Sequence, residues 1–190
     1  MLNFFKYITY IPRKAKNNLD NIYKETIAHR GYHFNYPENS MLAYEEAIRR
    51  KEAIELDIRM TKDGIIICLH DRYLKRLLGI SGRASKMTFD QIEKCKILKT
   101  QSSVPTLEEA LKVIDGKVTL LIEVKGLMNK RFENKIINML SKYKGKLYFH
   151  AKNIITYYKL KSIYKDKVFW VLNPFRRRFN FIKAKTIHTN

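Results

Sequence analysis

The chain has 190 residues, of which 45% are hydrophobic and 29% charged, so it is long enough for one domain and too apolar for a disordered protein. It carries 38 Lys and Arg against 18 Asp and Glu residues, a net charge of +20. No apolar run approaches the roughly 20 residues that cross a bilayer, which argues against an integral membrane protein. Two cysteines, Cys68 and Cys95, are too few for a disulfide scaffold and predict a reducing, cytoplasmic location.

The positive charge is concentrated in the second half of the chain. Residues 1–110 hold 19 basic and 14 acidic side chains, whereas residues 111–190 hold 19 basic and 4 acidic ones. A surface of this kind attracts phosphate esters, nucleic acid or an anionic membrane. A merely solubilising lysine-rich surface explains the same numbers. We do not expect nucleic acid as the partner, because the sequence contains no recognition helix or known nucleic-acid motif.

Residues 1–25 differ from the rest of the chain. An aromatic stretch over residues 2–11 ends at Pro12 and is followed by Arg13, Lys14 and Lys16. Such a segment can lie in a membrane interface, so we predict peripheral contact with an anionic membrane, or else a helix that covers the base of the domain. A secretory signal is not expected, since Lys6 interrupts the apolar stretch and no basic run precedes it.

From residue 26 onward, short β-rich runs alternate with segments of helical period, which is typical of an α/β fold with a largely parallel sheet. We predict one domain over residues 26–190. The expected strands are 26–29, 53–58, 65–70, 118–124, 146–151 and 168–172, with a candidate seventh at 186–188. The expected helices are 41–50, one that begins near residue 107 and ends near Gly116, 130–143 and 154–164. Capping boxes are expected at Thr88 with Gln91 and at Thr106 with Glu109. A complete (β/α)8 barrel typically needs about 250 residues, so a barrel here would be short or incomplete at its C-terminal end.

Carboxylates lie on two of the predicted strands. The two-residue period places Glu55 and Asp57 on one face of strand 53–58, and Glu123 lies near the end of strand 118–124. Carboxylates on a hydrophobic strand are costly unless a cation pairs with them. A salt bridge at the strand end would be enough to explain any single one of these carboxylates. Together they predict a site for a hard divalent cation, Mg²⁺ or Ca²⁺.

Two histidines close neighbouring predicted strands. His29 ends the first strand and His70 the third, and Asp63-Gly64 indicates a tight turn between the second and third strands. A hairpin with a two-residue turn would place Asp57 opposite His70. A barrel would instead run these strands side by side and still gather both residues at one rim.

Paired histidines of near-neutral pKa can act as general base and general acid on a metal-bound phosphate. Arg30 and Lys125 would then neutralise the phosphate oxygens. The other histidines are predicted to be structural: His33, His150 and His188.

Seven ordered motifs over residues 26–126 resemble the glycerophosphodiester phosphodiesterases. They are His29-Arg30-Gly31, Pro37-Glu38-Asn39-Ser40, Glu55-Leu56-Asp57-Ile58, Thr61-Lys62-Asp63-Gly64, His70-Asp71, Val104-Pro105-Thr106-Leu107-Glu108-Glu109 and Ile122-Glu123-Val124-Lys125. The resemblance implies a TIM-type barrel and a divalent-cation-dependent enzyme that hydrolyses glycerophosphodiesters to glycerol 3-phosphate and an alcohol.

Carried over by position, the resemblance implies a role for each matching residue. It implies metal ligands at Glu55, Asp57 and Glu123, an acid/base pair at His29 and His70, phosphate contacts at Arg30 and Lys125, and a position near the site for Asn39. The second half departs from the family pattern: residues 149–152 read Phe-His-Ala-Lys where the family commonly has a Ser-Phe strand end.

Two alternatives remain at this stage. Sphingomyelinase D-type phospholipases have a similar barrel with a comparable His, Glu-x-Asp and His spacing, but the Pro-Glu-Asn-Ser and Ile-Glu-Val-Lys motifs argue against them. The other alternative is a truncated, inactive barrel that binds an anionic membrane or another polyanion through its basic half, including the arginines at 176–178.

Overall fold

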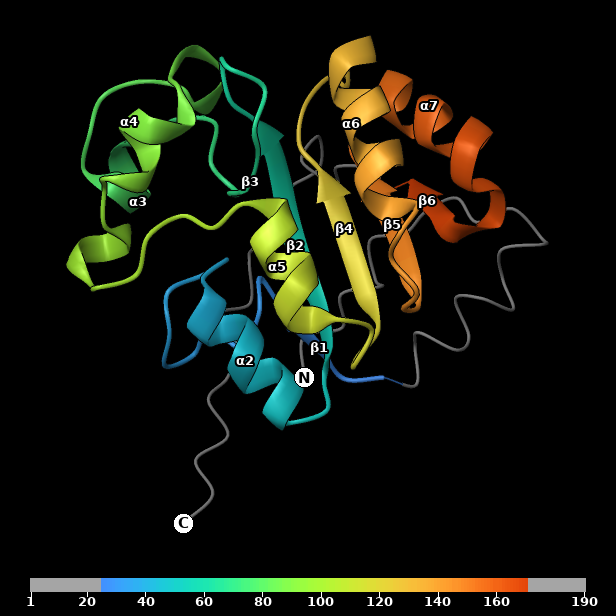
Figure 1. Cartoon of the computed structure of the whole chain (residues 1–190), viewed down its shortest axis with the longest axis horizontal. Helices are drawn as coiled ribbons and strands as arrows, with labels where there is room; N and C mark the ends of the chain where they lie inside the picture. The colour runs from blue at the N-terminus through green and yellow to red at the C-terminus, as the bar shows by residue number, and fades with distance from the viewer. Residues whose placement is uncertain (1–24, 171–190) are drawn as a thin grey trace, which may run out of the picture.

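The computed structural model describes residues 25–170, and Figure 1 shows how their helices and strands are arranged. The strands are β1 (Ile27–His29), β2 (Ala53–Met60), β3 (Ile66–Cys68), β4 (Leu120–Val124), β5 (Leu147–Ala151) and β6 (Val168–Trp170). The α-helices are α2 (Met41–Arg49), α3 (Lys75–Leu78), α4 (Phe89–Glu93), α5 (Leu107–Ile114), α6 (Lys130–Leu140) and α7 (Ile154–Tyr164), and the 3-10 helices are η3 (Ala84–Lys86), η4 (Ile97–Lys99) and η5 (Lys165–Lys167). The aromatic and basic N-terminal segment, the candidate strand 186–188, His188 and the arginines at 176–178 lie outside the described residues.

The sheet follows the order β1-β2-β4-β5-β6, and all of these strands run parallel. Helices α2, α5, α6 and α7 cover one face of the sheet (Figure 1). Alternating strands and helices around a parallel sheet confirm the predicted α/β barrel class. The described part of the chain contains five of the parallel strands of such a barrel, in agreement with the expectation of a short or incomplete one.

Strand β3 is the exception, because it pairs antiparallel with β2. The Thr61 amide donates to the Ile65 carbonyl at 2.9 Å, so the turn spans residues 62–64, with Gly64 at a φ of 89°. The assumed two-residue turn is therefore wrong. The extra residue shifts the register by one, and Asp57 accepts a hydrogen bond from the Leu69 amide instead of lying opposite His70.

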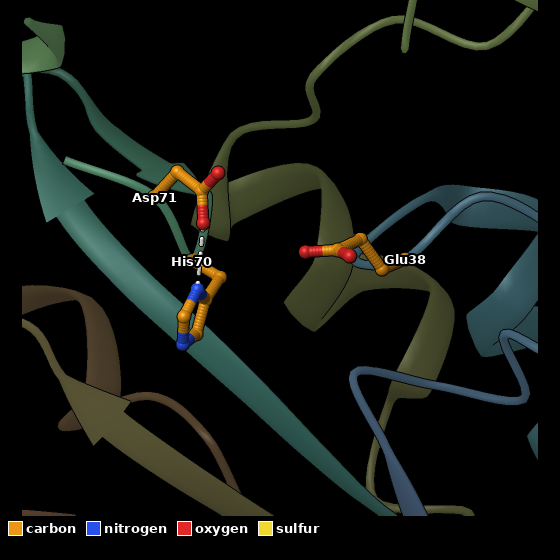
Figure 2. Close-up of side chains that lie close together, drawn as sticks. All are labelled: Glu38, His70 and Asp71. Carbon is orange, nitrogen blue, oxygen red and sulfur yellow. Dashed lines mark hydrogen bonds and ion pairs between the residues drawn. The ribbon is translucent and has the colours of Figure 1, made fainter. Parts of the chain in front are cut away.

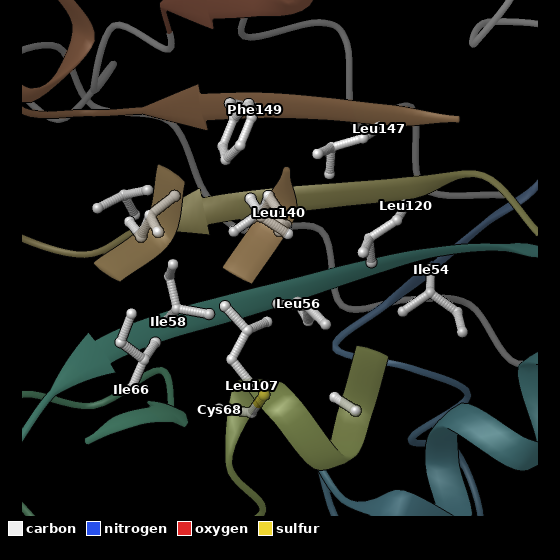
Figure 3. Close-up of a cluster of buried hydrophobic side chains, with 14 of the residues drawn as sticks. Ile54, Leu56, Ile58, Ile66, Cys68, Leu107, Leu120, Leu140, Leu147 and Phe149 are labelled. Carbon is white, nitrogen blue, oxygen red and sulfur yellow. The ribbon is translucent and has the colours of Figure 1, made fainter. Parts of the chain in front are cut away.

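Two apolar cores hold these elements together. The larger core lies between the sheet and its helices, where Leu56 and Ile58 of β2 lie close to Leu107 of α5 (Figure 3). The smaller core lies in the excursion between β3 and α5 and is built from Ile67, Leu69, Leu74, Leu77, Leu78, Ala84, Ile92, Ile97 and Val104. Both are fully apolar clusters, so the charged residues of β2 must point to the other face of the sheet.

Helices α2, α5, α6 and α7 begin where the sequence predicts. Thr106 and Glu109 form the expected capping box at the start of α5, and Thr88 with Gln91 forms another at α4. Helix α5 ends at Asp115, which adopts a left-handed conformation just before Gly116. Within residues 25–170, no helix is both long and apolar enough to span a membrane.

Candidate active site at the carboxyl ends of the strands

The strand register aligns the charged residues across the sheet. Asp57 on β2 lies beside Glu123 on β4, which lies beside His150 on β5, and Glu55 lies beside His29 of β1. Glu55 and Asp57 are fully buried, and Glu123 is 3% exposed. These side chains alternate with the core residues Leu56 and Ile122, so they share the face that the helices leave uncovered.

Glu55 is held by a backbone amide and faces two imidazoles. Its Oε2 accepts a hydrogen bond from the Arg30 amide at 2.9 Å. Its Oε1 lies 3.3 Å from His150 Nε2, while His29 Nε2 is 3.9 Å from Oε2. Arg30 reaches this position through a left-handed φ of 60°, and Gly31 follows at 74°. A Cβ at Gly31 would come within 2.8 Å of the Ala43 Cβ, so only glycine lets this loop pack against α2.

Asp57 is surrounded by donors and cations. Lys125 Nζ lies 2.8 Å from Oδ1, while Asn39 Nδ2 donates to Oδ2 at 2.9 Å and Arg30 Nε lies 3.5 Å away. Burial alone would raise the pKa of Asp57, but the charges of Lys125, His70 and Arg30 outweigh it and hold the pKa well below its ordinary value. Asp57 is thus a carboxylate at neutral pH.

Asn39 fixes the orientation of this carboxylate. Its Oδ1 accepts from both the Asp57 amide and the Tyr44 hydroxyl, each at 3.1 Å. Asn39 is 1% exposed and has a φ of 52°, a conformation that asparagine tolerates better than most residues. Asn39 thus lies beside the carboxylates, while its contact with a substrate stays a prediction.

Glu123 shares Lys125 with Asp57. Lys125 Nζ lies 2.6 Å from Glu123 Oε1, Lys152 Nζ lies 3.2 Å from the same oxygen, and His150 Nε2 lies 3.7 Å from Oε2. Burial acts to raise the pKa of Glu123, and the neighbouring cationic groups hold it below its ordinary value. Burial likewise acts to lower the pKa of Lys125, but the two carboxylates keep that pKa raised.

His70 belongs to a second polar chain at the edge of the same site (Figure 2). Its Nδ1 lies 2.8 Å from Asp71 Oδ1, and its other ring nitrogen points away from Asp71. Arg76 donates to both Asp71 and Glu38, and Arg30 donates to Glu38 at 2.9 Å. Burial opposes the ionisation of Asp71, but hydrogen bonds from Arg76 and His70 lower its pKa to about 2.

Both predicted catalytic histidines reach solvent. The side chains of His29 and His70 are 40% and 30% exposed, whereas the carboxylates behind them are buried. Burial of the rings lowers both pKa values below the usual 6.5, against the opposing charges of Glu55 for His29 and Asp57 for His70. A lowered pKa favours the neutral imidazole, which is the form that can accept a proton.

The structure brings the predicted site residues into one region. Direct contacts connect His29, Arg30, Asn39, Glu55, Asp57, Glu123 and Lys125. The charge on Asp57 links His70 to this group. The catalytic and binding roles assigned to these residues stay predictions.

Sequence reasoning missed four polar residues at this site. Glu38 precedes Asn39 in the motif Pro-Glu-Asn-Ser, and Asp71 follows His70 in the motif His-Asp. Their place beside predicted site residues could have identified both. His150 was predicted to be structural, because a single histidine on a strand usually is, yet its Nε2 faces two site carboxylates. Lys152 follows the same strand and contacts Glu123.

Two clusters among the described residues have donor atoms placed to hold a metal ion. One comprises Glu55, Glu123 and His150, and the other comprises Glu38, His70 and Asp71; within each cluster the donor atoms lie within 4.8 Å of one another. The first cluster suits a divalent cation better, because its groups are buried and Glu123 is held as a carboxylate. Arg76 already binds both acidic residues of the second.

The predicted ligand set differs from the first cluster by one residue. Asp57 was expected among the ligands; its oxygens contact Lys125 and Asn39, Glu123 likewise contacts Lys125, and the ligand role of Asp57 stays a prediction. Asp57 still lies next to this cluster. It is the neighbour of Glu123 in the sheet, and both carboxylates contact Lys125. An ion held by Glu55 and Glu123 would therefore lie next to the Asp57 carboxylate.

Comparisons with known proteins agree with the fold and identify the family. Residues 29–163 match the model of the glycerophosphoryl diester phosphodiesterase family. A glycerophosphodiester phosphodiesterase of Bacillus subtilis is 34% identical over 179 residues, covering 83% of this chain and 60% of that protein. Another from Bacillus altitudinis is 32% identical over 104 residues, covering 51% of this chain and 42% of that protein. The chain thus spans less than two thirds of the length of these relatives.

Solved structures show the same fold. A phosphodiesterase from Oleispira antarctica, in complex with the product sn-glycerol-3-phosphate, has a TM-score of 0.69 at 24% identity and matches 76% of this chain and 63% of its own. The glycerophosphodiester phosphodiesterase of Thermotoga maritima has a TM-score of 0.61 at 27% identity, over 74% of this chain and 57% of its own. The family match covers most of the chain and includes the aligned carboxylates and histidines. The chain therefore belongs to the glycerophosphoryl diester phosphodiesterase family.

Proposed function

We propose that the chain hydrolyses glycerophosphodiesters to glycerol 3-phosphate and an alcohol with the help of a divalent cation. The observation that carries the proposal is a cluster of buried carboxylates flanked by two partly exposed histidines. The relatives named as glycerophosphodiester phosphodiesterases, and the product bound in the Oleispira antarctica structure, support this substrate class.

In this proposal Glu55 and Glu123 hold the cation, with Asp57 beside them. When bound, a divalent cation would supply Lewis acidity toward a phosphate oxygen and so offset the negative charge that repels a nucleophile. The guanidinium of Arg30 lies beside Asp57 and donates to Glu38, and in this proposal it also binds a second phosphate oxygen. Lys125 contributes positive charge from behind the carboxylates.

The contact with Asp71 favours His70 as the general base. A neutral His70 that donates its Nδ1–H to the Asp71 carboxylate has a lone pair on Nε2, the nitrogen that points away from Asp71 in Figure 2. Asp71 stays ionised because Arg76 binds it, so it stabilises the imidazolium that forms after proton transfer. His29, whose Nε2 lies 3.9 Å from Glu55, would act as the general acid in its protonated form, which the charge of Glu55 favours, and would give that proton to the departing alcohol.

The test is a coupled assay for glycerol 3-phosphate with glycerophosphocholine or glycerophosphoglycerol as substrate. We expect activity with a divalent cation, loss with chelator and recovery when the cation returns. Glu55→Gln should lower the rate at least about 100-fold, whereas Glu108→Gln, on the exposed surface of α5, should not change it. Activity that is indifferent to chelation and to Glu55→Gln would end the metal proposal. Choline release from intact sphingomyelin would favour the sphingomyelinase D-type alternative instead.

We also infer that the chain works in the cytoplasm, in peripheral contact with anionic membranes. The cysteine content and the basic second half support this inference. Its test is the fraction of the protein that sediments with the membranes of lysed cells. Release of that fraction by salt would support an electrostatic contact, and a purely soluble protein would contradict it.

A further inference from the structure

We propose that His150 is a metal ligand of this chain, together with Glu55 and Glu123, and that its nitrogen makes the site prefer Mn²⁺ to Ca²⁺. The inference rests on the metal dependence proposed above and narrows it. It also differs from the sequence expectation, which placed Mg²⁺ or Ca²⁺ among oxygen ligands alone.

The geometry of the three groups carries the inference. His150 Nε2 lies 3.3 Å from Glu55 Oε1 and 3.7 Å from Glu123 Oε2. Metal–ligand bonds of about 2.0–2.6 Å place adjacent ligand atoms roughly 3–3.7 Å apart, so these atoms are spaced like neighbours around one ion. All three side chains are nearly or fully buried, with His150 2% exposed. The strand register holds His150 directly beside Glu123.

The chemistry of the donors sets the preference. Carboxylates bind Mg²⁺, Ca²⁺ and Mn²⁺, whereas imidazole favours first-row transition ions. Two carboxylates with one imidazole therefore favour Mn²⁺ over Ca²⁺. A purely structural histidine at this position would instead occupy the oxygens of the two carboxylates, and it would compete with any metal. The two roles predict opposite effects of removing the ring.

The experiment measures binding and not turnover. Wild type, His150→Gln and His33→Gln are stripped with chelator and titrated with MnCl2 and CaCl2 by calorimetry, and near-UV circular dichroism checks the fold. We expect His150→Gln to weaken Mn²⁺ binding about 10–100-fold and Ca²⁺ binding less than about threefold. His33→Gln removes an exposed imidazole outside both clusters, so it should bind both ions as the wild type does.

The outcomes separate the two proposals. Mn²⁺ binding that is unchanged or tighter in His150→Gln overturns the role of His150 and leaves the proposed function standing. A wild type that binds neither ion overturns both. Should His150→Gln fail to fold, the pulsed electron paramagnetic resonance spectrum of Mn²⁺ bound to the wild type decides. Coupling to a nitrogen nucleus supports the inference, and its absence contradicts it.

An exposed apolar strip beside this site carries a second, independent inference. We define the strip as Leu127, Ile154, Ile155 and Tyr158, whose exposed fractions are 60%, 39%, 53% and 63%. Thr156 joins its two parts, because its hydroxyl donates to the Gly126 carbonyl and accepts from the Met128 amide on either side of Leu127. The strip follows the ends of β4 and β5, the strands that carry Glu123 and His150.

We infer that the strip docks on an anionic membrane surface, next to the mouth of the site. The segment that contains the strip, residues 126–167, has eleven basic and two acidic side chains, a net charge of +9. Exposed apolar side chains on a strongly basic segment match an anionic lipid interface, where the rings and aliphatic groups enter the headgroup region. This surface is separate from the N-terminal segment that the sequence suggested for membrane contact.

Flotation of the full chain with phosphatidylcholine vesicles, with and without phosphatidylglycerol, tests the docking surface. We expect binding only to the anionic vesicles and a decrease of at least about tenfold in Leu127→Ser/Ile155→Ser. The control Leu98→Ser removes an exposed leucine from η4, away from the strip, and should bind normally. Equal flotation of wild type and double variant, or equal binding to neutral vesicles, contradicts the inference.

Discussion

Replacing Lys125 by methionine tests whether one buried ammonium holds the carboxylates together. Lys125 Nζ lies 2.8 Å from Asp57 and 2.6 Å from Glu123, and its side chain is 7% exposed. At an effective dielectric constant of about 20, each contact contributes about 6 kcal/mol of attraction. Desolvation of the ammonium offsets much of this, and breaking one side of a buried ion pair typically costs about 3–5 kcal/mol. We expect Lys125→Met to lower the free energy of unfolding by that amount at pH 7.

The dependence on pH follows from the same contacts. Without Lys125 the pKa values of Asp57 and Glu123 rise, so protonation relieves their repulsion as the pH falls toward about 4. Urea denaturation of cation-free protein at pH 7 and pH 4 should therefore show a smaller loss at the lower pH. The control Lys152→Met removes an ammonium that is 46% exposed and 3.2 Å from Glu123, and should cost less than about 1 kcal/mol. A loss below about 1 kcal/mol for Lys125→Met, or the same loss at both pH values, would refute the reasoning.

Three further predictions concern the residues around this pair. Asp71→Asn removes the carboxylate that orients His70. The rate of glycerophosphocholine hydrolysis should therefore fall about 10²–10⁴-fold. An unchanged rate would contradict the role of His70 as the general base. Asn39→Ala should lower the free energy of unfolding by about 2–4 kcal/mol in urea denaturation, because it leaves buried polar groups of Asp57 without hydrogen-bond partners and places alanine in a left-handed backbone conformation. Asn39→Gly removes the same hydrogen bonds but tolerates that conformation, so it should lower the free energy of unfolding by less. A larger decrease for Asn39→Gly than for Asn39→Ala would show that the backbone is not strained. Asp71 and Glu123 have pKa values below their ordinary ones, so their contribution to stability is complete above about pH 4–5 and is lost as the pH falls toward 2. The midpoint of thermal unfolding should therefore decrease between pH 7 and pH 2.5. A constant midpoint would count against a stabilising role for the contacts of these two carboxylates.

Much of the site could be predicted because a strand has a period of two. That period alone puts Glu55 and Asp57 on the face opposite Leu56, as observed. The capping boxes at Thr88 and Thr106 were equally accessible, since they depend on residues only three positions apart. The resemblance of seven motifs then identified the family, which the comparisons confirm.

The remainder depends on contacts that the sequence does not encode locally. The observed register of the β2-β3 hairpin differs from the predicted one because the turn contains three residues and not two. The dipeptide Asp63-Gly64 alone does not distinguish these turn lengths. The position of His150 beside Glu123 depends on the pairing of β5 with β4. No local sequence pattern predicts which strands pair. The contact of Lys125 with both Asp57 and Glu123 likewise required the three-dimensional structure.

Phosphorus NMR of glycerophosphocholine turnover tests the central claim most directly. If buried carboxylates hold a cation at the phosphate while His70 and His29 move the protons, the spectrum should show glycerol 3-phosphate as the final product, formed only with the divalent cation present. Formation of phosphocholine, or no turnover by the cation-loaded full chain, would contradict the account.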